Sequence, residues 1–431
     1  MNNLLKYYIW TIGCQMNKAD SERLENALTQ LGFENTNNPS QSDLIVLNSC
    51  VVRQGAEDKV VGMLTSLKPI KEKNPQMILA LMGCMVGPNT KDLNQKFPYA
   101  DIFIQPQNYT PLIDYIEQKL NIDTQGCLTQ LTAKPDVTAY IPIVQGCDKF
   151  CSFCIIPYRR GREICRPVKE IISETQYLSQ RGVKEITLLG QNIDSYGHDL
   201  PGKPDLGDLL KKLNKIDGIE RIRFLTSHPN DMSDNIIESV AELDKVCEHI
   251  NLPIQAGDDD ILNEMRRGYT NEEYRQLIDK IRSKIPNVSI STDIIVGFCG
   301  ESDMQFQKTL DIIKDIRFDK VHAAAYSIRE NTIAMRKMVD SISMEEKKYR
   351  LNTIESIQKN ILQEKNSLLS GETFEVLVEG VKKNSQYGRN RNDKLIYFES
   401  HEDLKGEMTN IKINKSTPWS LHGEKIPIEI K

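Results

Sequence analysis

The chain has 431 residues, a formal net charge of −5 and a hydrophobic fraction of 39%. This length predicts two or three globular domains, and no run of about 18 apolar residues suggests a membrane span. The acidic balance does not favour nucleic-acid binding by the chain as a whole, so any RNA contact must come from local basic patches.

The first part of the chain, 1–125, alternates between strand-like and helix-like segments. Its apolar runs predict buried strands, and its amphipathic stretches predict helices. This pattern is typical of a parallel sheet covered by helices on both faces, and therefore of an α/β fold. Strands are predicted over 7–12, 43–48, 77–82 and 100–104, and helices over 19–31, 54–68 and 111–120.

Three cysteines follow consecutive strands of this predicted sheet. Cys14, Cys50 and Cys84 each come just after the carboxyl end of a strand, and in an open parallel sheet those ends lie along one edge, where ligands bind. Three thiols brought together there predict an iron–sulfur cluster with one iron left open. The alternative is three unrelated buried cysteines.

The second part, 136–369, contains six further predicted strands with helices between them. Six such repeats favour a partial (β/α)6 barrel of the TIM type, in which active residues lie at the carboxyl ends of the strands. The strands are predicted over 140–144, 185–189, 221–225, 249–254, 288–296 and 321–326.

A loop with the spacing C-x3-C-x2-C follows the first of these strands. Cys147, Cys151 and Cys154 in the segment GCDKFCSFC can hold three irons of a cubane cluster and leave the fourth iron open to a small molecule. Structural zinc is disfavoured because no nearby Cys or His completes a tetrahedron.

The segment MNNLLKYYIW is too short and polar for a signal, so we expect a cytoplasmic protein without disulfides. The other cysteines are expected to be free thiols: Cys127, Cys165, Cys247 and Cys299.

The last part, 370–431, has three alternating segments that predict strands, over 374–380, 394–399 and 407–413. They indicate a small β-barrel of the OB type, a fold that commonly binds RNA through a basic, aromatic face. Its acidic and basic residues balance, so only a cluster of cations supports phosphate contact.

The stretch 148–169, beside the cluster loop, is more basic than the last part, with six cations, two acidic residues and a local net charge of +4. The predicted phosphate contacts are Arg159, Arg160 and Arg162 near the cluster loop, and Lys382, Lys383, Arg389, Arg391 and Lys394 in the last part.

Several motifs resemble those of the methylthiotransferase family of radical S-adenosylmethionine (SAM) enzymes. They are GCQMN at 13–17, NSCVVR at 48–53, GCM at 83–85, QGC at 145–147, PYRRGR at 157–162 and LGQN at 189–192. The wording QMN resembles the branch that modifies tRNA, and GRNR at 388–391 with PWSL at 418–421 resembles a TRAM domain.

The resemblance implies a transferase with two 4Fe-4S clusters and two molecules of SAM. One SAM would methylate sulfur held at the auxiliary cluster of the first triad, and the second would be cleaved at the barrel cluster. The acceptor would be carbon 2 of N6-isopentenyladenosine (N6-dimethylallyladenosine) beside the anticodon of tRNA. Candidate SAM contacts at the strand ends are Gln191, Asn192, Ser227 and Gln255, with polar loop caps as the alternative.

The resemblance also sets expectations for partners. They are the anticodon stem-loop of tRNA and an electron donor such as flavodoxin or ferredoxin, while the sulfur donor is unknown; we expect a monomer. Two other functions stay open: the same chemistry on N6-threonylcarbamoyladenosine of tRNA or on an aspartate of a ribosomal protein, and a non-enzymatic RNA-binding or electron-transfer protein with two clusters.

Overall fold

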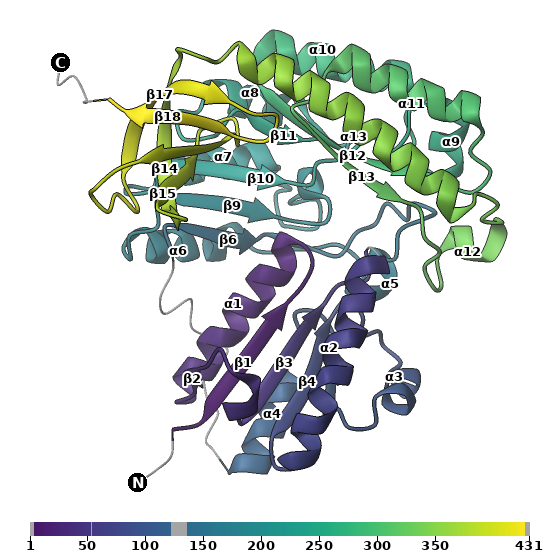
Figure 1. Cartoon of the computed structure of the whole chain (residues 1–431), viewed down its shortest axis with the longest axis vertical. Coiled ribbons are helices and arrows are strands. Elements are labelled where there is room, and N and C mark those ends of the chain that lie inside the picture. The colour runs from purple at the N-terminus through teal and green to yellow at the C-terminus, as the bar shows by residue number, and fades with distance from the viewer. Residues whose placement is uncertain (1–3, 53, 122–135, 427–431) are drawn as a thin grey trace.

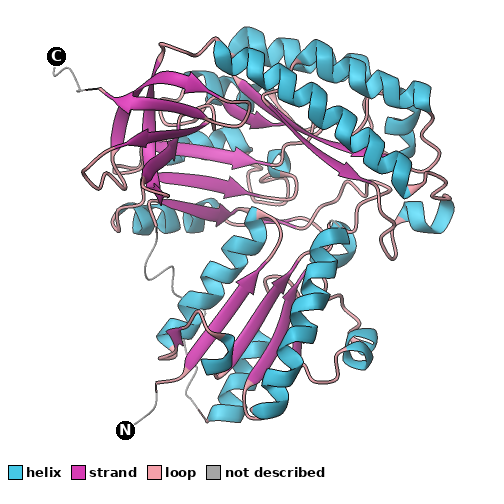
Figure 2. Cartoon of the chain, in the orientation of Figure 1, coloured by secondary structure: helices cyan, strands magenta, loops and turns pink. Residues whose placement is uncertain are grey.

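The computed structural model describes residues 4–52, 54–121 and 136–426. Figure 1 shows the N-terminal sheet and its helices below the rest of the chain, with the C-terminal strands folded against one side of the central part. Figure 2 shows the central strands as a curved layer with helices along its outer side. Within the described ranges, no helix combines the length and the apolar content needed to cross a membrane. Cys127 lies outside these ranges.

The N-terminal part is a five-stranded parallel sheet in the order β2-β1-β3-β4-β5. Side chains of β3 alternate between its faces: Ile45 and Leu47 pack with α2, whereas Leu44 and Val46 pack with α1 and α4. The sheet is therefore buried on both faces, which confirms the prediction. The strands are β1 (Lys6–Thr11), β2 (Glu34–Asn35), β3 (Leu44–Ser49), β4 (Ile78–Gly83) and β5 (Ile102–Ile104). The helices are α1 (Gln15–Gln30), η1 (Pro39–Gln41), α2 (Gln54–Lys73), α3 (Lys91–Lys96) and α4 (Thr110–Leu120).

The central part has six parallel strands in two sheets, β6-β9-β10 and β11-β12-β13. A parallel bridge between Ile222 and Val246 connects β10 to the segment before β11. One apolar core runs through both sheets and the helices around them, so the predicted partial barrel is confirmed. The strands are β6 (Thr138–Pro142), β7 (Val144–Gln145), β8 (Ile164–Cys165), β9 (Glu185–Leu189), β10 (Arg221–Leu225), β11 (His249–Asn251), β12 (Ser289–Val296) and β13 (Lys320–Ala325), of which β7 and β8 form a separate antiparallel pair.

Helices alternate with the strands of this barrel. The longest of them, α13, packs against β13 and carries the chain into the C-terminal part. The helices are α5 (Ile156–Arg160), α6 (Val168–Ser179), η2 (Ile193–Ser195), α7 (Leu206–Leu213), α8 (Asp234–Glu242), α9 (Asp259–Glu264), α10 (Asn271–Lys284), α11 (Asp303–Ile316), α12 (Ile333–Lys337) and α13 (Met344–Ser367).

The C-terminal part is a closed five-stranded barrel in the order β14-β15-β16-β18-β17. Alternating residues such as Val376, Val378, Ile411 and Ile413 point into its core, as expected for strands with one buried face. The three predicted strands are present, and β15 and β18 complete the barrel. The strands are β14 (Thr373–Lys382), β15 (Ser385–Arg389), β16 (Leu395–Glu399), β17 (Met408–Ser416) and β18 (Leu421–Lys425).

Two buried arginines of β10 fix the small barrel against the central part. Arg221, whose side chain is 0% exposed, donates to the carbonyl oxygens of Arg389 and Glu375 at 2.6 and 2.9 Å. Arg223 donates to the carbonyls of Asn390 and Arg391 at 2.7 and 2.8 Å. Because a buried guanidinium needs partners for its donors, these hydrogen bonds fix the position of the small barrel relative to the central part.

Candidate functional site

The first cysteine triad assembles at the carboxyl edge of the N-terminal sheet, as the sequence predicted. Cys14, Cys50 and Cys84 follow β1, β3 and β4, which are neighbours in the sheet. Cys14 is the exposed residue before α1, and the other two are buried. Burial raises the pKa of the Cys84 thiol to about 11; the Arg160 guanidinium opposes this effect, and the neighbouring Cys14 and Cys50 add to it.

Two asparagines hold the strand ends and the start of α1 in this arrangement. The amide of Asn17 donates to the carbonyls of Ile12 and Ser49 at 3.0 and 2.8 Å, and the amide of Asn48 donates to the carbonyl of Asn17 at 2.7 Å. Asn17 and Asn48 are both fully buried. The motifs GCQMN and NSC therefore place asparagines that position the cysteines in addition to supplying the thiols.

Gly83 is required beside this triad for steric reasons. Its φ is +95°, and a Cβ there would lie 2.5 Å from Asn48 Oδ1 and would also collide with the Ser49 carbonyl. Gly83→Ala should destabilise the fold by about 2–3 kcal/mol and displace the adjacent Cys84, so the iron content should fall. Iron analysis and thermal unfolding test this expectation.

Gly32→Ala is the matched control. Gly32 also has a positive φ, +84°, but none of the described residues would place an atom within 4 Å of an added Cβ. The substitution therefore carries only the backbone cost, about 1 kcal/mol. If the two variants had equal iron contents and stabilities, the crowding at Gly83 would have no role.

The second triad lies in the loop after β7, anchored to the barrel. The amide and hydroxyl of Ser152 donate to the carbonyls of Met265 and Glu264 at 3.0 and 2.7 Å. Arg267, itself buried, donates to the sulfur of Cys151 at 3.2 Å. Burial raises the pKa of the Cys147 and Cys154 thiols to about 12, so both thiols must lose protons when they bind metal.

The ligand type of both triads suits an iron–sulfur cluster. Each triad offers three cysteine sulfurs, and such soft thiolate ligands are those that iron–sulfur clusters use.

The four candidate SAM contacts lie at strand ends in the barrel, and three of them already make a side-chain hydrogen bond within the protein. Gln191 accepts from the Gly146 amide at 2.6 Å, which ties β9 to the cluster loop. Ser227 donates to Asp194 at 3.0 Å. Asn192 donates to Asp231 at 2.7 Å and keeps a buried oxygen without a partner among the described residues. Gln255 has a φ of +75°, a conformation that non-glycine residues adopt sparsely.

Sequence reasoning missed four polar residues of this site. Lys149 pairs with Asp231 at 2.6 Å, and burial raises the pKa of Asp194 to about 7. Burial lowers the pKa of His228 to about 2, and its buried Nε2 has no partner in the described part of the chain. Asp194 and Asp231 follow the predicted strand ends by a few residues, and that position was the available signal.

The predicted phosphate contacts near the cluster loop fall in different environments. The guanidinium of Arg162 is exposed and paired with Asp148, and that of Arg159 lies 3.8 Å from Glu330. Arg160 requires a correction, because its side chain is only 1% exposed and bonds to Asp20 and Asn17 instead of facing solvent.

The C-terminal cations also divide into two groups. Lys382 and Lys383 are exposed at the tip of the β14–β15 hairpin. Arg389, Arg391 and Lys394 form ion pairs with acidic residues, and the last two of these pairs join the small barrel to the central part. The partners are Glu379 for Arg389, Glu248 for Arg391 and Asp319 for Lys394.

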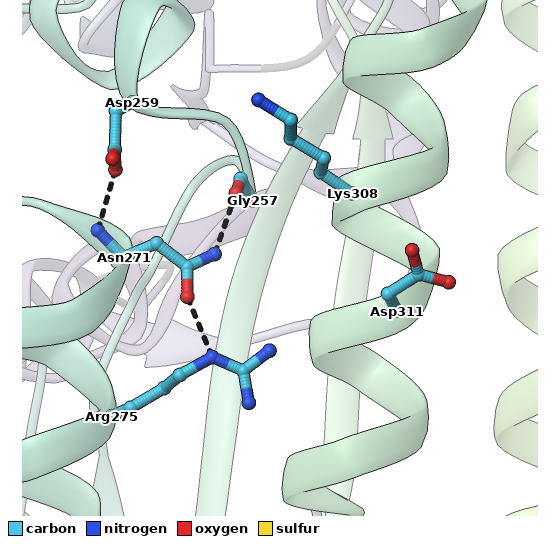
Figure 3. Close-up of a pocket in the computed structure, with 6 residues that line it drawn as sticks. All are labelled: Gly257, Asp259, Asn271, Arg275, Lys308 and Asp311. Carbon is cyan, nitrogen blue, oxygen red and sulfur yellow. Dashed lines mark hydrogen bonds between the residues drawn. The ribbon is translucent and has the colours of Figure 1, made fainter.

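A shallow cleft of about 280 Å³ lies apart from both triads, between α10, α11 and the loop before α9. Figure 3 shows that Asn271 bonds to Asp259, Gly257 and Arg275 across its floor. Its lining includes none of the cysteines or candidate SAM contacts, so it is separate from both candidate cluster sites.

Comparison with known families and proteins matches every part of the chain. Residues 6–105 match an uncharacterized protein family, UPF0004, residues 141–313 match the Radical SAM superfamily, and residues 368–426 match the TRAM domain. In fold, the chain resembles the radical S-adenosylmethionine methyltransferase TsrM from Kitasatospora setae, with a TM-score of 0.58 and 11% identity over 89% of this chain and 80% of that one.

The open barrel with a three-cysteine loop after its first strand defines a radical SAM protein. Two similar proteins are named tRNA-2-methylthio-N(6)-dimethylallyladenosine synthase. The one from Dehalococcoides mccartyi is 47% identical over 98% of this chain and 99% of that protein. The one from Herpetosiphon aurantiacus is 46% identical over 98% of this chain and 97% of that protein. The chain belongs to the tRNA-2-methylthio-N(6)-dimethylallyladenosine synthase family.

Proposed function

We propose that this protein is a tRNA methylthiotransferase that converts N6-isopentenyladenosine beside the anticodon to its 2-methylthio derivative. The observation that carries the proposal is the pair of cysteine triads, one at the ends of three neighbouring strands and the other in one loop of the barrel, in a chain 47% identical to a relative of that name. Cys147, Cys151 and Cys154 would hold the SAM-binding cluster, and Cys14, Cys50 and Cys84 the auxiliary cluster. When bound, the cluster at the barrel would supply the electron that cleaves SAM, and the cluster at the sheet would present sulfur for transfer.

The side chains of the protein would bind and orient these groups and keep water away from them. The bond between Gly146 and Gln191 fixes the start of the cluster loop. Asn192 and His228 each keep a buried atom that has no partner among the residues described, and these atoms are suited to the polar groups of SAM, since buried polar atoms need partners. Met16 of α1 packs with Leu189 at the end of β9, and both side chains are buried there.

We propose that tRNA binds partly through an aromatic ladder on the small barrel. Tyr387, Tyr397 and His422 are half-buried neighbours on β15, β16 and β18, with ring centroids 6.1 and 5.5 Å apart. Aromatic faces of this kind stack on unpaired bases, and the exposed Lys382 and Lys383 can contact phosphates. The partners would be the anticodon stem-loop, whose bases can be splayed out, and a small electron carrier such as flavodoxin or ferredoxin; a single chain would suffice.

Tyr397→Ala should weaken tRNA binding because it removes the central ring of the ladder. A lost base stack costs about 1–3 kcal/mol, so the Kd for tRNA should rise by about 5- to 150-fold while SAM cleavage without tRNA is unchanged. Filter binding measures this. Tyr349→Ala, at an exposed tyrosine of α13, is the control, and equal Kd values for both variants would remove the ladder from the RNA surface.

The activity is tested by expressing the chain in a bacterium that lacks its own enzyme for this modification. Mass spectrometry of digested tRNA should reveal 2-methylthio-N6-isopentenyladenosine. A methylthio group on N6-threonylcarbamoyladenosine instead would reassign the acceptor. No methylthiolated nucleoside, with soluble and iron-loaded protein in the cells, would contradict the proposal.

A further inference from the structure

Arg160 belongs to the central part by sequence but lies in the auxiliary site of the N-terminal part. It is the last residue of α5, six residues after Cys154, and its guanidinium reaches α1. There its Nη2 donates to Asp20 at 2.9 Å and to Asn17 at 3.1 Å. The ion pair with Asp20 is dry, because both side chains are only 1% exposed.

The other end of the guanidinium fork lies beside the first triad. Nη1 of Arg160 is buried and makes no close hydrogen bond within the described part of the chain. The Cys84 thiol lies within hydrogen-bonding reach of the guanidinium, and the charge of Arg160 also acts on Cys14. A buried charged donor is costly without a good acceptor, and a neutral thiol is only a weak one.

We propose that Arg160 is a positioning residue for the auxiliary cluster, donating Nη1 to a sulfur of that cluster from the helix that follows the barrel cluster loop. The inference rests on the proposed function, because it requires a cluster at Cys14, Cys50 and Cys84. Arg160 then connects the radical-generating site to the sulfur-bearing site by one short helix.

The sign of the electrostatic effect follows from the charge. A cluster held by three thiolates is anionic and becomes more so on reduction, and hydrogen bonds and nearby charge set its potential. A buried cation beside it stabilises the reduced form more than the oxidised form. Removing that cation should therefore make reduction less favourable.

The test uses the full chain with Cys147, Cys151 and Cys154 replaced by alanine, so that only the auxiliary cluster is present. In this background, a redox titration followed by electron paramagnetic resonance (EPR) gives its midpoint potential. Arg160→Gln should lower the equilibrium constant for reduction about tenfold or more, a shift of at least about 59 mV to more negative potential. Arg160→Lys keeps the charge and should shift it less.

Arg23→Gln is the control for domain contact. Arg23 lies on α1, the helix that Arg160 contacts, and it reaches the central part through Glu174 at 3.1 Å. If Arg160 served only to hold the two parts together, Arg23→Gln and Arg160→Gln would behave alike, and the proposal would be overturned. It would also be overturned if Arg160→Gln left the potential unchanged.

Loss of the cluster from Arg160→Gln, with retention in Arg23→Gln, would support the proposal because the donor would then be needed for binding. The variant without Cys147, Cys151 and Cys154 distinguishes the assignment of the first triad from the role of Arg160. If it holds no cluster, the assignment of the first triad fails and the inference fails with it; if it holds one that ignores Arg160, only the inference fails.

Discussion

Replacing Cys14, Cys50 and Cys84 together by alanine is expected to abolish methylthiolation while SAM cleavage continues. The triad lies on the N-terminal sheet, separate from the loop that carries Cys147, Cys151 and Cys154. Losing a group that takes part in the chemistry costs at least about a thousandfold in rate, so the 2-methylthio nucleoside should fall below detection. 5′-Deoxyadenosine should still form within a few-fold of its original rate. Both products are measured by mass spectrometry in one assay.

The control replaces three cysteines outside the triads. Cys165, Cys247 and Cys299 are buried free thiols, and their replacement by alanine should preserve both products. Methylthiolation that survived the loss of the first triad would show that the sulfur comes from elsewhere, and the division of labour between the two sites would be abandoned.

Replacing Cys147, Cys151 and Cys154 by alanine should abolish both products and leave half of the iron. This loop would hold the cluster at which SAM binds, so neither 5′-deoxyadenosine nor the 2-methylthio nucleoside can form without it. The first triad remains intact, and the iron content should fall by about half. Iron analysis and EPR on the reconstituted variant measure this directly.

The two triple variants together distinguish two separate sites from one shared site. A complete loss of iron from the barrel variant would mean that the triads load as one unit. Retention of SAM cleavage by that variant would contradict the assignment of the loop.

The sequence allowed the triads and the strands beneath them to be predicted because their signals are local. Cys14, Cys50 and Cys84 stand at the ends of apolar runs, and parallel sheets bring such ends together. The helix start was placed less well, because α1 begins at Gln15, four residues before the predicted start. Its first turn holds a buried polar residue, Asn17, whose side chain bonds to the strand ends, so the apolar pattern of the helix does not reach its true start.

The roles of the arginines could not be predicted because they depend on partners distant in sequence. A basic stretch indicates a surface patch only if its charges face solvent, but Arg160 finds Asp20 on the other domain. Arg391 similarly forms an ion pair with Glu248, across the interface between the small barrel and the central part. Ion pairs with sequence separations of 140 and 143 residues leave no local pattern. The sequence therefore indicated that these residues are positively charged but not which partners their side chains contact.

The most direct test of the central claim is one anaerobic assay on the reconstituted protein with SAM, a reductant and tRNA that carries N6-isopentenyladenosine. We expect 2-methylthio-N6-isopentenyladenosine and 5′-deoxyadenosine to appear together, both detected by mass spectrometry. Formation of 5′-deoxyadenosine without the modified nucleoside would reject this acceptor, and absence of both from protein with a full complement of iron would contradict the assignment of the chain as a radical SAM methylthiotransferase.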